Sequence, residues 1–305
     1  MKQSWTTFNI GNLSGKTAIV TGGNAGLGLA TVHQLLMHGT DVVVASRSVE
    51  RGEKAVAGLG PQRGTAEVLQ LDLADLASVE AFANAVKARH DKIDLLINNA
   101  GIMMTDPAVT KDGFELQFGT NHLGHFALTG HLMEQITNTP GSRIVNVSSL
   151  AHRWGDMDQL PDAGLDEPYK KVKAYGRSKL ANLLFTFELQ RRFAVMGADT
   201  MAVAAHPGSA GTGLANHLLD GRYTSKLQAP FKALLTQPAE AGALPTLRAA
   251  TDPGAFGGQY FGPDGMGEQR GAPVIVAAKP EAYDLTLASD LWSQSERLTG
   301  VSYLN

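Results

Sequence analysis

Tyr175 and Lys179 lie four residues apart in a segment, 174–180, that reads as helix, so their side chains leave the same face. An unperturbed tyrosine has a pKa of about 10 and keeps its proton at neutral pH, whereas a nearby ammonium group stabilises the phenolate and lowers that pKa. The pair is therefore a candidate for general acid/base catalysis. Because the same spacing also occurs by chance on solvated helices, the rest of the chain must decide.

The composition narrows the classes of function. The 305 residues include 34 glycines, are 43% hydrophobic and only 18% charged, which is typical of a compact, turn-rich globular fold. A net charge of −3 gives no general attraction to nucleic acid or anionic lipid. The chain has no cysteine, which excludes disulfides and cysteine nucleophiles. With no export signal or membrane-length apolar run, we expect a cytoplasmic protein with no membrane or nucleic-acid partner.

A glycine-rich turn near the N-terminus indicates a dinucleotide site. Residues 17–20 form a β-type run, residues 29–37 have helical apolar spacing, and the glycines lie between them. Glycine lets the backbone approach a pyrophosphate closely, and the helix N-terminus offers it free N–H groups. The residues predicted to bind the cofactor here are Gly22, Asn24, Gly26, Leu27 and Gly28.

The next two strand ends predict which dinucleotide binds. The strand 41–46 is followed directly by Arg47, with Ser46 before it and no carboxylate, which suits a ribose 2′-phosphate and favours NADP(H) over NAD(H). The alternative is that Arg47 is only a surface charge. After the strand 65–71, Asp72 and Leu73 are placed to contact the adenine, although Asp72 could instead cap the following helix.

Strands and helices alternate along the rest of the chain. We predict a single Rossmann-fold α/β domain over residues 1–305, a doubly wound parallel sheet of seven strands with helices on both faces. Asn99, Ala100 and Gly101 follow the fourth strand and are predicted to line the cofactor cleft. The remaining strands are expected at 94–97, 143–147, 201–205 and 259–261, and the remaining helices at 49–59, 76–90, 114–135, 175–196, 238–250 and 283–298.

Two segments have little periodicity. Residues 1–14 look like an arm that tucks Trp5, Phe8 and Ile10 against the body, and 209–236 is predicted to be a substrate lid.

Three histidines lie on different elements with no acidic partner spaced to match, so we predict no metal site: His122, His125 and His152. Apolar side chains in the expected pocket walls suggest an apolar ligand, although packing could explain each of them: Met103, Met104, Trp154, Leu160, Leu214 and Leu218.

Taken in order, these marks resemble the short-chain dehydrogenases/reductases over nearly the whole chain. They are Thr21-Gly22-xxx-Gly26-x-Gly28, Asn98-Asn99-Ala100-Gly101, Asn121, the serine after the fifth strand, Tyr175-xxx-Lys179 and Pro207-Gly208. The runs Asn121-His-Leu-Gly-His-Phe and Ser178-Lys-Leu-Ala-Asn182 are most similar to the retinol dehydrogenase and WW-domain oxidoreductase branch. The resemblance implies a ketone or aldehyde reductase or an alcohol dehydrogenase.

The resemblance also implies a role for each residue. Tyr175 would give a proton to a carbonyl oxygen, or take one from an alcohol, and Lys179 would lower its pKa and bind the nicotinamide ribose. Ser149 would hold the substrate oxygen, with Ser148 as the competing choice, and Asn121 would keep a water that relays protons. The implied contacts at the nicotinamide end are Pro207, Gly208 and Thr212.

The chain departs from the family pattern before the catalytic tyrosine. Relatives usually place the serine about a dozen residues before the tyrosine, but here Ser149 and Tyr175 are 26 positions apart (175 − 149), so 150–174 holds an insertion. We expect it to shape the substrate pocket. It could also block the four-helix interface through which many relatives dimerise, which leaves monomer and homo-oligomer both open. The membrane anchor of microsomal retinol dehydrogenases is not expected here.

Two other functions fit the same fold. One is a non-catalytic dinucleotide-sensing protein, which typically loses the tyrosine or the lysine, whereas both Tyr175 and Lys179 are present. The other is an extended-type epimerase or dehydratase, which has a differently spaced glycine pattern and a larger C-terminal substrate domain. Neither of those features is evident in this sequence.

Overall fold

The computed structural model describes residues 4–157, 164–165, 168–209 and 237–304. Its centre is an eight-stranded sheet in the order β3-β2-β1-β4-β5-β6-β7-β8. The strands are β1 (Thr17–Thr21), β2 (Asp41–Ser46), β3 (Ala66–Gln70), β4 (Leu95–Asn98), β5 (Ser142–Val147), β6 (Thr200–Ala205), β7 (Tyr260–Pro263) and β8 (Pro273–Ile275). The strand order reverses between β1 and β4, which is where doubly wound sheets bind ligands.

Helices cover both faces of the sheet. The α-helices are α1 (Gly26–Met37), α2 (Val49–Ala57), α3 (Leu76–Lys87), α4 (Leu116–Phe118), α5 (Gly124–His131), α6 (Met133–Thr137), α7 (Lys171–Met196), α10 (Ala239–Thr251) and α11 (Leu285–Thr299). The shorter helical turns are η1 (Thr7–Asn9), the π-helical η2 (Gly119–Leu123), η3 (Leu150–Trp154), η4 (Met266–Glu268) and η5 (Pro280–Tyr283).

Alternating strand residues form two separate cores. Ile19 of β1 faces a core that contains Phe82 of α3 and Phe185 of α7, and Val20 faces the other, with Leu35 of α1 and Leu247 of α10. This alternation follows from the two-residue period of a strand. Both faces of the sheet are therefore buried, as expected for a parallel sheet that is covered by helices on both sides.

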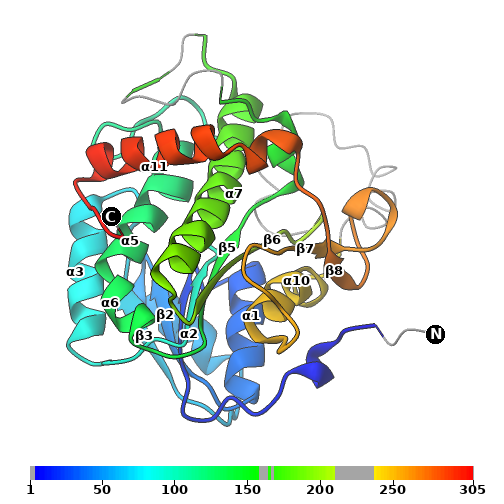
Figure 1. The fold of residues 1–305 in the computed structure, drawn as a ribbon. Helices are drawn as coiled ribbons and strands as arrows, with labels where there is room; N and C mark the ends of the chain where they lie inside the picture. The colour runs from blue at the N-terminus through cyan, green and yellow to red at the C-terminus, as the bar shows by residue number, and fades with distance from the viewer. Residues whose placement is uncertain (1–3, 158–163, 166–167, 210–236, 305) are drawn as a thin grey trace, which may run out of the picture.

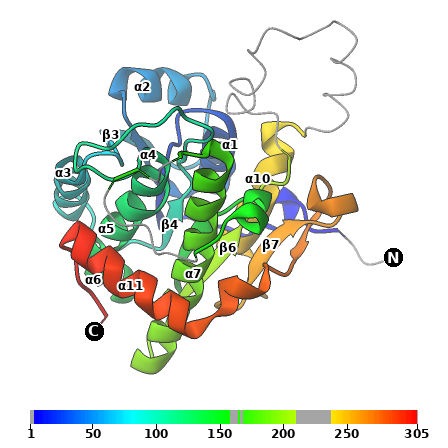
Figure 2. The same ribbon diagram turned by 90° about the horizontal axis from the view of Figure 1, so that it is seen from above.

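The C-terminal helix adds an outer layer over α7. Figures 1 and 2 both show α11, in red, crossing α7, and Leu291 of α11 packs with Leu180 and Leu184 of α7. Asp284 caps the start of α11 by accepting a hydrogen bond from the backbone N–H of Leu287 (2.9 Å). The helix that carries Tyr175 is thus clamped between the sheet and α11.

The structure confirms the doubly wound α/β fold and all seven predicted strands, and it adds an eighth. β8 pairs antiparallel with β7 at the sheet edge, whereas the neighbours from β1 to β7 run parallel. A three-residue strand that begins with proline carries too little pattern to predict. The single helix predicted over 114–135 is instead broken into α4, η2 and α5, with α6 after it.

The N-terminal arm agrees with the prediction only in part. Trp5, Ile10 and Leu13 are buried in the core that contains α1, but Phe8 is 97% exposed. Phe8 lies in η1, a single 3₁₀ turn with no buried residue. Apart from Ser209, the predicted lid 209–236 lies outside the described residues, as do Leu160, Thr212, Leu214 and Leu218.

Candidate active site

The α7 helix carries Tyr175 and Lys179 across the carboxyl end of β5. Both side chains are buried, and the Lys179 Nζ atom lies 5.8 Å from the centre of the Tyr175 ring. Lys179 Nζ donates a hydrogen bond to the backbone carbonyl of Val147, the last residue of β5 (3.0 Å). The helical spacing seen in the sequence therefore places both side chains against the ligand-binding edge of the sheet.

The two serines after β5 point in different directions. Ser149 lies beside the Tyr175 phenol, and its Oγ accepts a hydrogen bond from the backbone N–H of Ala151 (3.2 Å). The hydroxyl of Ser148 is buried and donates to the backbone carbonyl of Lys179 (2.8 Å). Ser149 is thus the serine that lies beside the tyrosine, while Ser148 fastens α7 to the strand.

Asn121 lies in the π-helical turn η2 and is fully buried. Its Nδ2 donates to the carbonyl of Ile102 and to Ser178 Oγ (both 2.9 Å), and its Oδ1 accepts from the N–H of Ile102 (2.8 Å). A Cβ atom built on Gly101 would lie 3.3 Å from both Asn121 Oδ1 and Lys179 Nζ. The structure therefore gathers the four predicted catalytic residues around one point.

Burial sets the protonation of the pair. It lowers the pKa of Lys179 to about 8, and it raises the pKa of Tyr175, with the nearby Ser149 hydroxyl acting in the opposite direction. The predicted net lowering of the Tyr175 pKa is therefore wrong in this structure. The physical reason is that desolvation of the buried phenol dominates.

The glycine-rich turn is shaped for a close ligand. Gly22 has φ +65°, and a Cβ atom on Gly28 would lie 2.2 Å from the Gly22 carbonyl oxygen, so only glycine fits there. Gly26 opens α1 with φ +51° and is exposed, with Asn24 and Leu27 half-buried beside it. The N-cap residue of α1 is Ala25, which has no capping side chain, so within the described residues the first N–H groups of the helix are available to a phosphate.

Thr21 ties this turn to the end of β4. Its Oγ1 accepts hydrogen bonds from the backbone N–H groups of Asn99 and Ala100 (2.9 Å each), and the Asn99 side chain donates to the Thr21 carbonyl (2.8 Å). No contact was predicted for Thr21 or Ser178. Both belong to the runs quoted for the family resemblance, which is the signal that could have pointed to them.

The predicted adenosine contacts lie at the ends of β2 and β3. Ser46 is buried and its hydroxyl donates to the carbonyl of Ser48 (3.0 Å), whereas Arg47 is exposed and makes no hydrogen bond or ion pair within the described parts of the chain. Asp72 accepts from the N–H of Ala74 (3.0 Å). It does not cap α3, because Asp75 does so. Leu73 is buried.

Comparison with known proteins settles the family. The family model described as short chain dehydrogenase matches residues 16–222. The chain is 38% identical over 295 residues to human retinol dehydrogenase 13, a match covering 95% of this chain and 86% of that protein. This chain belongs to the short-chain dehydrogenase family. Within it, matches to human retinol dehydrogenases 13, 14 and 11 at 37–39% identity assign it to the retinol dehydrogenase branch.

Solved structures agree with this assignment. An uncharacterised protein from Mycobacterium paratuberculosis superposes with a TM-score of 0.80 at 37% identity, and the match covers 99% of both chains. A short-chain dehydrogenase from Burkholderia cenocepacia in complex with NADP has a TM-score of 0.64 at 26% identity, covering 82% of this chain and 96% of that one. Members of this family use a nicotinamide cofactor to carry hydride.

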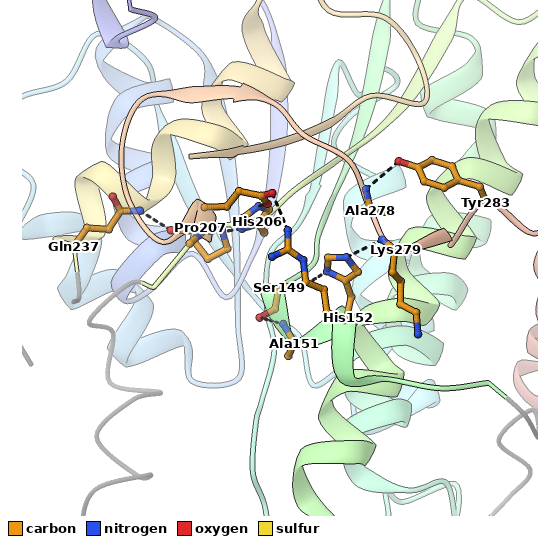
Figure 3. Close-up of polar contacts among 12 residues, drawn as sticks. Ser149, Ala151, His152, His206, Pro207, Gln237, Ala278, Lys279 and Tyr283 are labelled. Carbon is orange, nitrogen blue, oxygen red and sulfur yellow. Dashed lines mark hydrogen bonds and ion pairs between the residues drawn. The ribbon is translucent and has the colours of Figure 1, made fainter. Parts of the chain in front are cut away.

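In this short-chain dehydrogenase a series of ion pairs links Arg153 of η3 to the turn after β6. His206 Nδ1 accepts from the N–H of Gly208 (3.2 Å), so its Nε2–H donates to Glu268 (3.0 Å), which also binds Arg153 (2.7 Å). Gln237 donates to the Pro207 carbonyl, which holds the other side of the same turn. Figure 3 shows Ser149 and His152 between this turn and Ala278-Lys279.

The first part of the predicted insertion packs directly on the catalytic helix. Residues 150–154 form η3, whose His152 accepts a hydrogen bond from the backbone N–H of Lys279 (3.3 Å). At Gly155 the backbones meet so closely that an added Cβ would lie 2.4 Å from the carbonyl carbon of Gly176. Asp156 also pairs with Lys173 (3.1 Å). The insertion thus fixes the position of the segment next to Tyr175.

Apolar side chains follow two of the site segments, Gly101 and η3. Met103 and Met104 are half-buried after Gly101, and Trp154, at the end of η3, is 64% exposed. Met104 has φ +55°, a strained conformation for a non-glycine residue, and its N–H donates to Gln117 Oε1 (2.8 Å). Within the described residues no helix is long and apolar enough to cross a bilayer.

Proposed function

We propose that the chain is an NADP(H)-dependent oxidoreductase that transfers a hydride between nicotinamide and the carbonyl or alcohol carbon of an apolar small molecule. The observation that carries this proposal is the placing of the Ser149 hydroxyl beside the Tyr175 phenol, with Lys179 and Asn121 also buried at this site. Two hydroxyl donors side by side are what a carbonyl oxygen needs as negative charge develops on it.

The proposed roles follow from the protonation states. The bound cofactor would supply or accept the hydride. In the reducing direction the hydroxyls of Ser149 and Tyr175 donate to the substrate oxygen, and Tyr175 then gives up its proton to complete the alcohol. Because burial raises the Tyr175 pKa, the phenol keeps this proton at neutral pH until the substrate oxygen becomes basic. Lys179, protonated below about pH 8, stabilises the phenolate that remains.

Replacing the proton on Tyr175 requires a path from solvent. We propose that Asn121 holds a water that passes protons from Lys179 toward bulk. In support, Asn121 Oδ1 and Lys179 Nζ lie at the same distance from a Cβ built on Gly101, so the two groups share one small space. The three side-chain bonds of Asn121 hold it still there.

The residues fit NADP(H) along the whole carboxyl edge of the sheet. The Gly22–Gly28 turn and the uncapped start of α1 would hold the pyrophosphate, and exposed Arg47 beside Ser46 would bind the 2′-phosphate. Asp72 and Leu73 would contact the adenine. The nicotinamide end would lie against Asn99, Ala100 and Gly101 after β4 and Pro207 and Gly208 after β6, with Thr212, outside the described residues, as a further proposed contact.

For the substrate we propose an apolar aldehyde, ketone or the corresponding alcohol. The half-buried Met103 and Met104 and the exposed indole of Trp154 offer apolar surface near Ser149. The relatives named retinol dehydrogenases make retinoids one class to test. The carbonyl panel should therefore span retinal, aromatic ketones, aliphatic aldehydes and quinones.

The proposal is tested by following NADPH oxidation over that panel, repeated with NADH. Carbonyl-dependent oxidation of NADPH with at least one member is expected. Tight NADPH binding without turnover of any carbonyl or alcohol would contradict the oxidoreductase and favour a dinucleotide-sensing protein.

The cofactor preference has its own test in Arg47→Ala. Losing a charge-assisted bond to the 2′-phosphate should weaken NADPH binding about tenfold or more and leave NADH binding within about twofold. Arg63→Ala is the matched control. Arg63 is also an exposed arginine, but it precedes β3 and so lies toward the amino ends of the strands, away from the carboxyl ends where the cofactor would bind. Equal losses for both cofactors would refute the role of Arg47.

A further inference from the structure

His125 lies between the cofactor turn and the catalytic cluster. It is the second residue of α5, one turn after Asn121, and it is 1% exposed. Its Nδ1 lies 2.9 Å from the backbone carbonyl oxygen of Asn121, and its Nε2 lies 2.9 Å from Thr21 Oγ1. One imidazole therefore touches both the π-helical turn η2 and the end of β1.

The partners of His125 determine where its proton lies. A carbonyl oxygen only accepts, so Nδ1 must carry the hydrogen that it gives to Asn121. In a neutral imidazole the other nitrogen is then an acceptor, so the hydroxyl of Thr21 donates to Nε2. Burial lowers the pKa of His125 to about 4, which keeps the ring neutral at physiological pH.

Thr21 has only one hydrogen to give and two lone pairs to fill. The lone pairs accept from the N–H groups of Asn99 and Ala100. The hydrogen goes to His125, because the other nearby acceptor, the carbonyl of Ile97, is farther away at 3.4 Å. Only one arrangement of hydrogens satisfies the polar atoms of Thr21 and His125 together, which makes this set of hydrogen bonds rigid.

We propose that His125 is a positioning residue that couples the cofactor-binding turn to the catalytic Asn121. Through Thr21 it holds the Asn99-Ala100 backbone, and through the Asn121 carbonyl it holds the turn on which the proton-relay residue is mounted. The catalytic part of this inference rests on the proposed function, whereas the link to cofactor binding does not require turnover.

Two variants separate the two links. His125→Asn places an amide N–H near the position of Nδ1 and keeps the bond to Asn121 while losing Thr21. His125→Gln places an amide oxygen near the position of Nε2 and keeps the bond from Thr21 while losing Asn121. His122→Phe is the matched control, because His122 is equally buried on η2 but contacts Ser295 and the rings of Phe118 and Phe185 instead.

The proposal predicts opposite effects in the two variants. His125→Gln should lower kcat about tenfold and leave the NADPH Kd within about twofold. His125→Asn should raise the NADPH Kd about fivefold or more and change kcat less. His122→Phe should leave both constants near those of the wild type, whatever it does to thermal stability. Nitrogen-15 NMR of the wild-type imidazole should show a protonated Nδ1 and an unprotonated Nε2.

Either of two results would overturn the proposal. The first is that both His125 variants change only the melting temperature, as His122→Phe does. The second is an Nε2–H tautomer of His125. If the wild type binds NADPH but turns over no carbonyl, the proposed function fails, and the Kd of His125→Asn together with the tautomer still decides the coupling.

Discussion

The two sides of the active site are held together in different ways. On the cofactor side, Thr21, Asn99 and Asn121 are joined by short hydrogen bonds between neighbouring strand ends and the turn beside them. On the substrate side, the contacts join segments that lie outside the strands: Arg153 of η3 pairs with Glu268 of η4, and His152 of η3 accepts a hydrogen bond from the backbone N–H of Lys279, just before η5.

This difference separates contacts that follow from the doubly wound sheet itself from contacts that depend on the extra segments of this chain. Any doubly wound sheet brings the ends of β1, β4 and β5 together, so the cofactor side needs only the right residues there. The substrate side depends on η3 and η4, where both Gly267 and Glu268 have positive φ. A strained, non-glycine residue held by Arg153 and His206 is expected where position matters more than stability.

The sharpest test on the substrate side compares the two serines. Ser149→Ala should lower kcat by on the order of 100-fold, because it removes a donor to the developing oxyanion. Ser148→Ala should keep kcat within about threefold and cost about 1 kcal/mol of unfolding free energy, since its hydroxyl only fastens α7. Steady-state kinetics and urea unfolding measure both, and the reverse pattern would exchange the two roles.

Lys179 joins the two sides, and its titration should be visible in the rate. Because burial lowers its pKa to about 8, reductive turnover should fall as the pH rises through 8 and the ammonium loses its charge. Lys179→Met should be slower by on the order of 100-fold and should lose this inflection. An unchanged pH profile in that variant would assign the titration to another group.

Gly155 tests whether the insertion positions the tyrosine. A methyl group at this residue meets the backbone of Gly176, so Gly155→Ala should cost about 1–3 kcal/mol of unfolding free energy and lower kcat about tenfold. The NADPH Kd should hardly change. Gly11→Ala is the control, because nothing lies within 4 Å of its added Cβ. A loss of NADPH affinity equal to the loss of kcat would mean that the two sides are not separate.

The smallest expected effect is on acid stability. Burial lowers the pKa of His122 to about 3, and those of His125 and His152 to about 4, while each binds a proton near pH 6.5 when unfolded. The unfolded state therefore binds more protons in this range, and stability that is full above pH 6.5 is lost as the pH falls toward 4. The urea midpoint should fall between pH 7 and pH 5. His122→Phe should reduce that fall.

The cofactor side could be predicted from the sequence because each of its residues stands at a strand end within a short motif. Seven strands and the convergence of Ser149, Asn121, Tyr175 and Lys179 followed from that pattern. The contacts of Glu268 with Arg153 and His206 could not be predicted, since nothing local marks a carboxylate in the glycine-rich segment 262–271. The direction of the Tyr175 pKa was also missed, because burial is a property of the packed structure.

The π-helical turn shows the same limit of local pattern on the cofactor side. The apolar spacing over 114–135 is helical throughout. Nothing in it indicates that η2 winds as a π-helix, with one extra residue in the turn that carries Asn121. Likewise, nothing in the sequence around His125 indicates its partners. Its two partners became evident only when α5 was placed beside β1.

The most direct test of the central claim is Tyr175→Phe, measured both for turnover of a carbonyl that the wild type reduces and for NADPH affinity. The account predicts a loss of kcat of about 1,000-fold with the NADPH Kd within about twofold, because only the phenolic proton is removed. Turnover close to that of the wild type would contradict the assignment of Tyr175 as the acid.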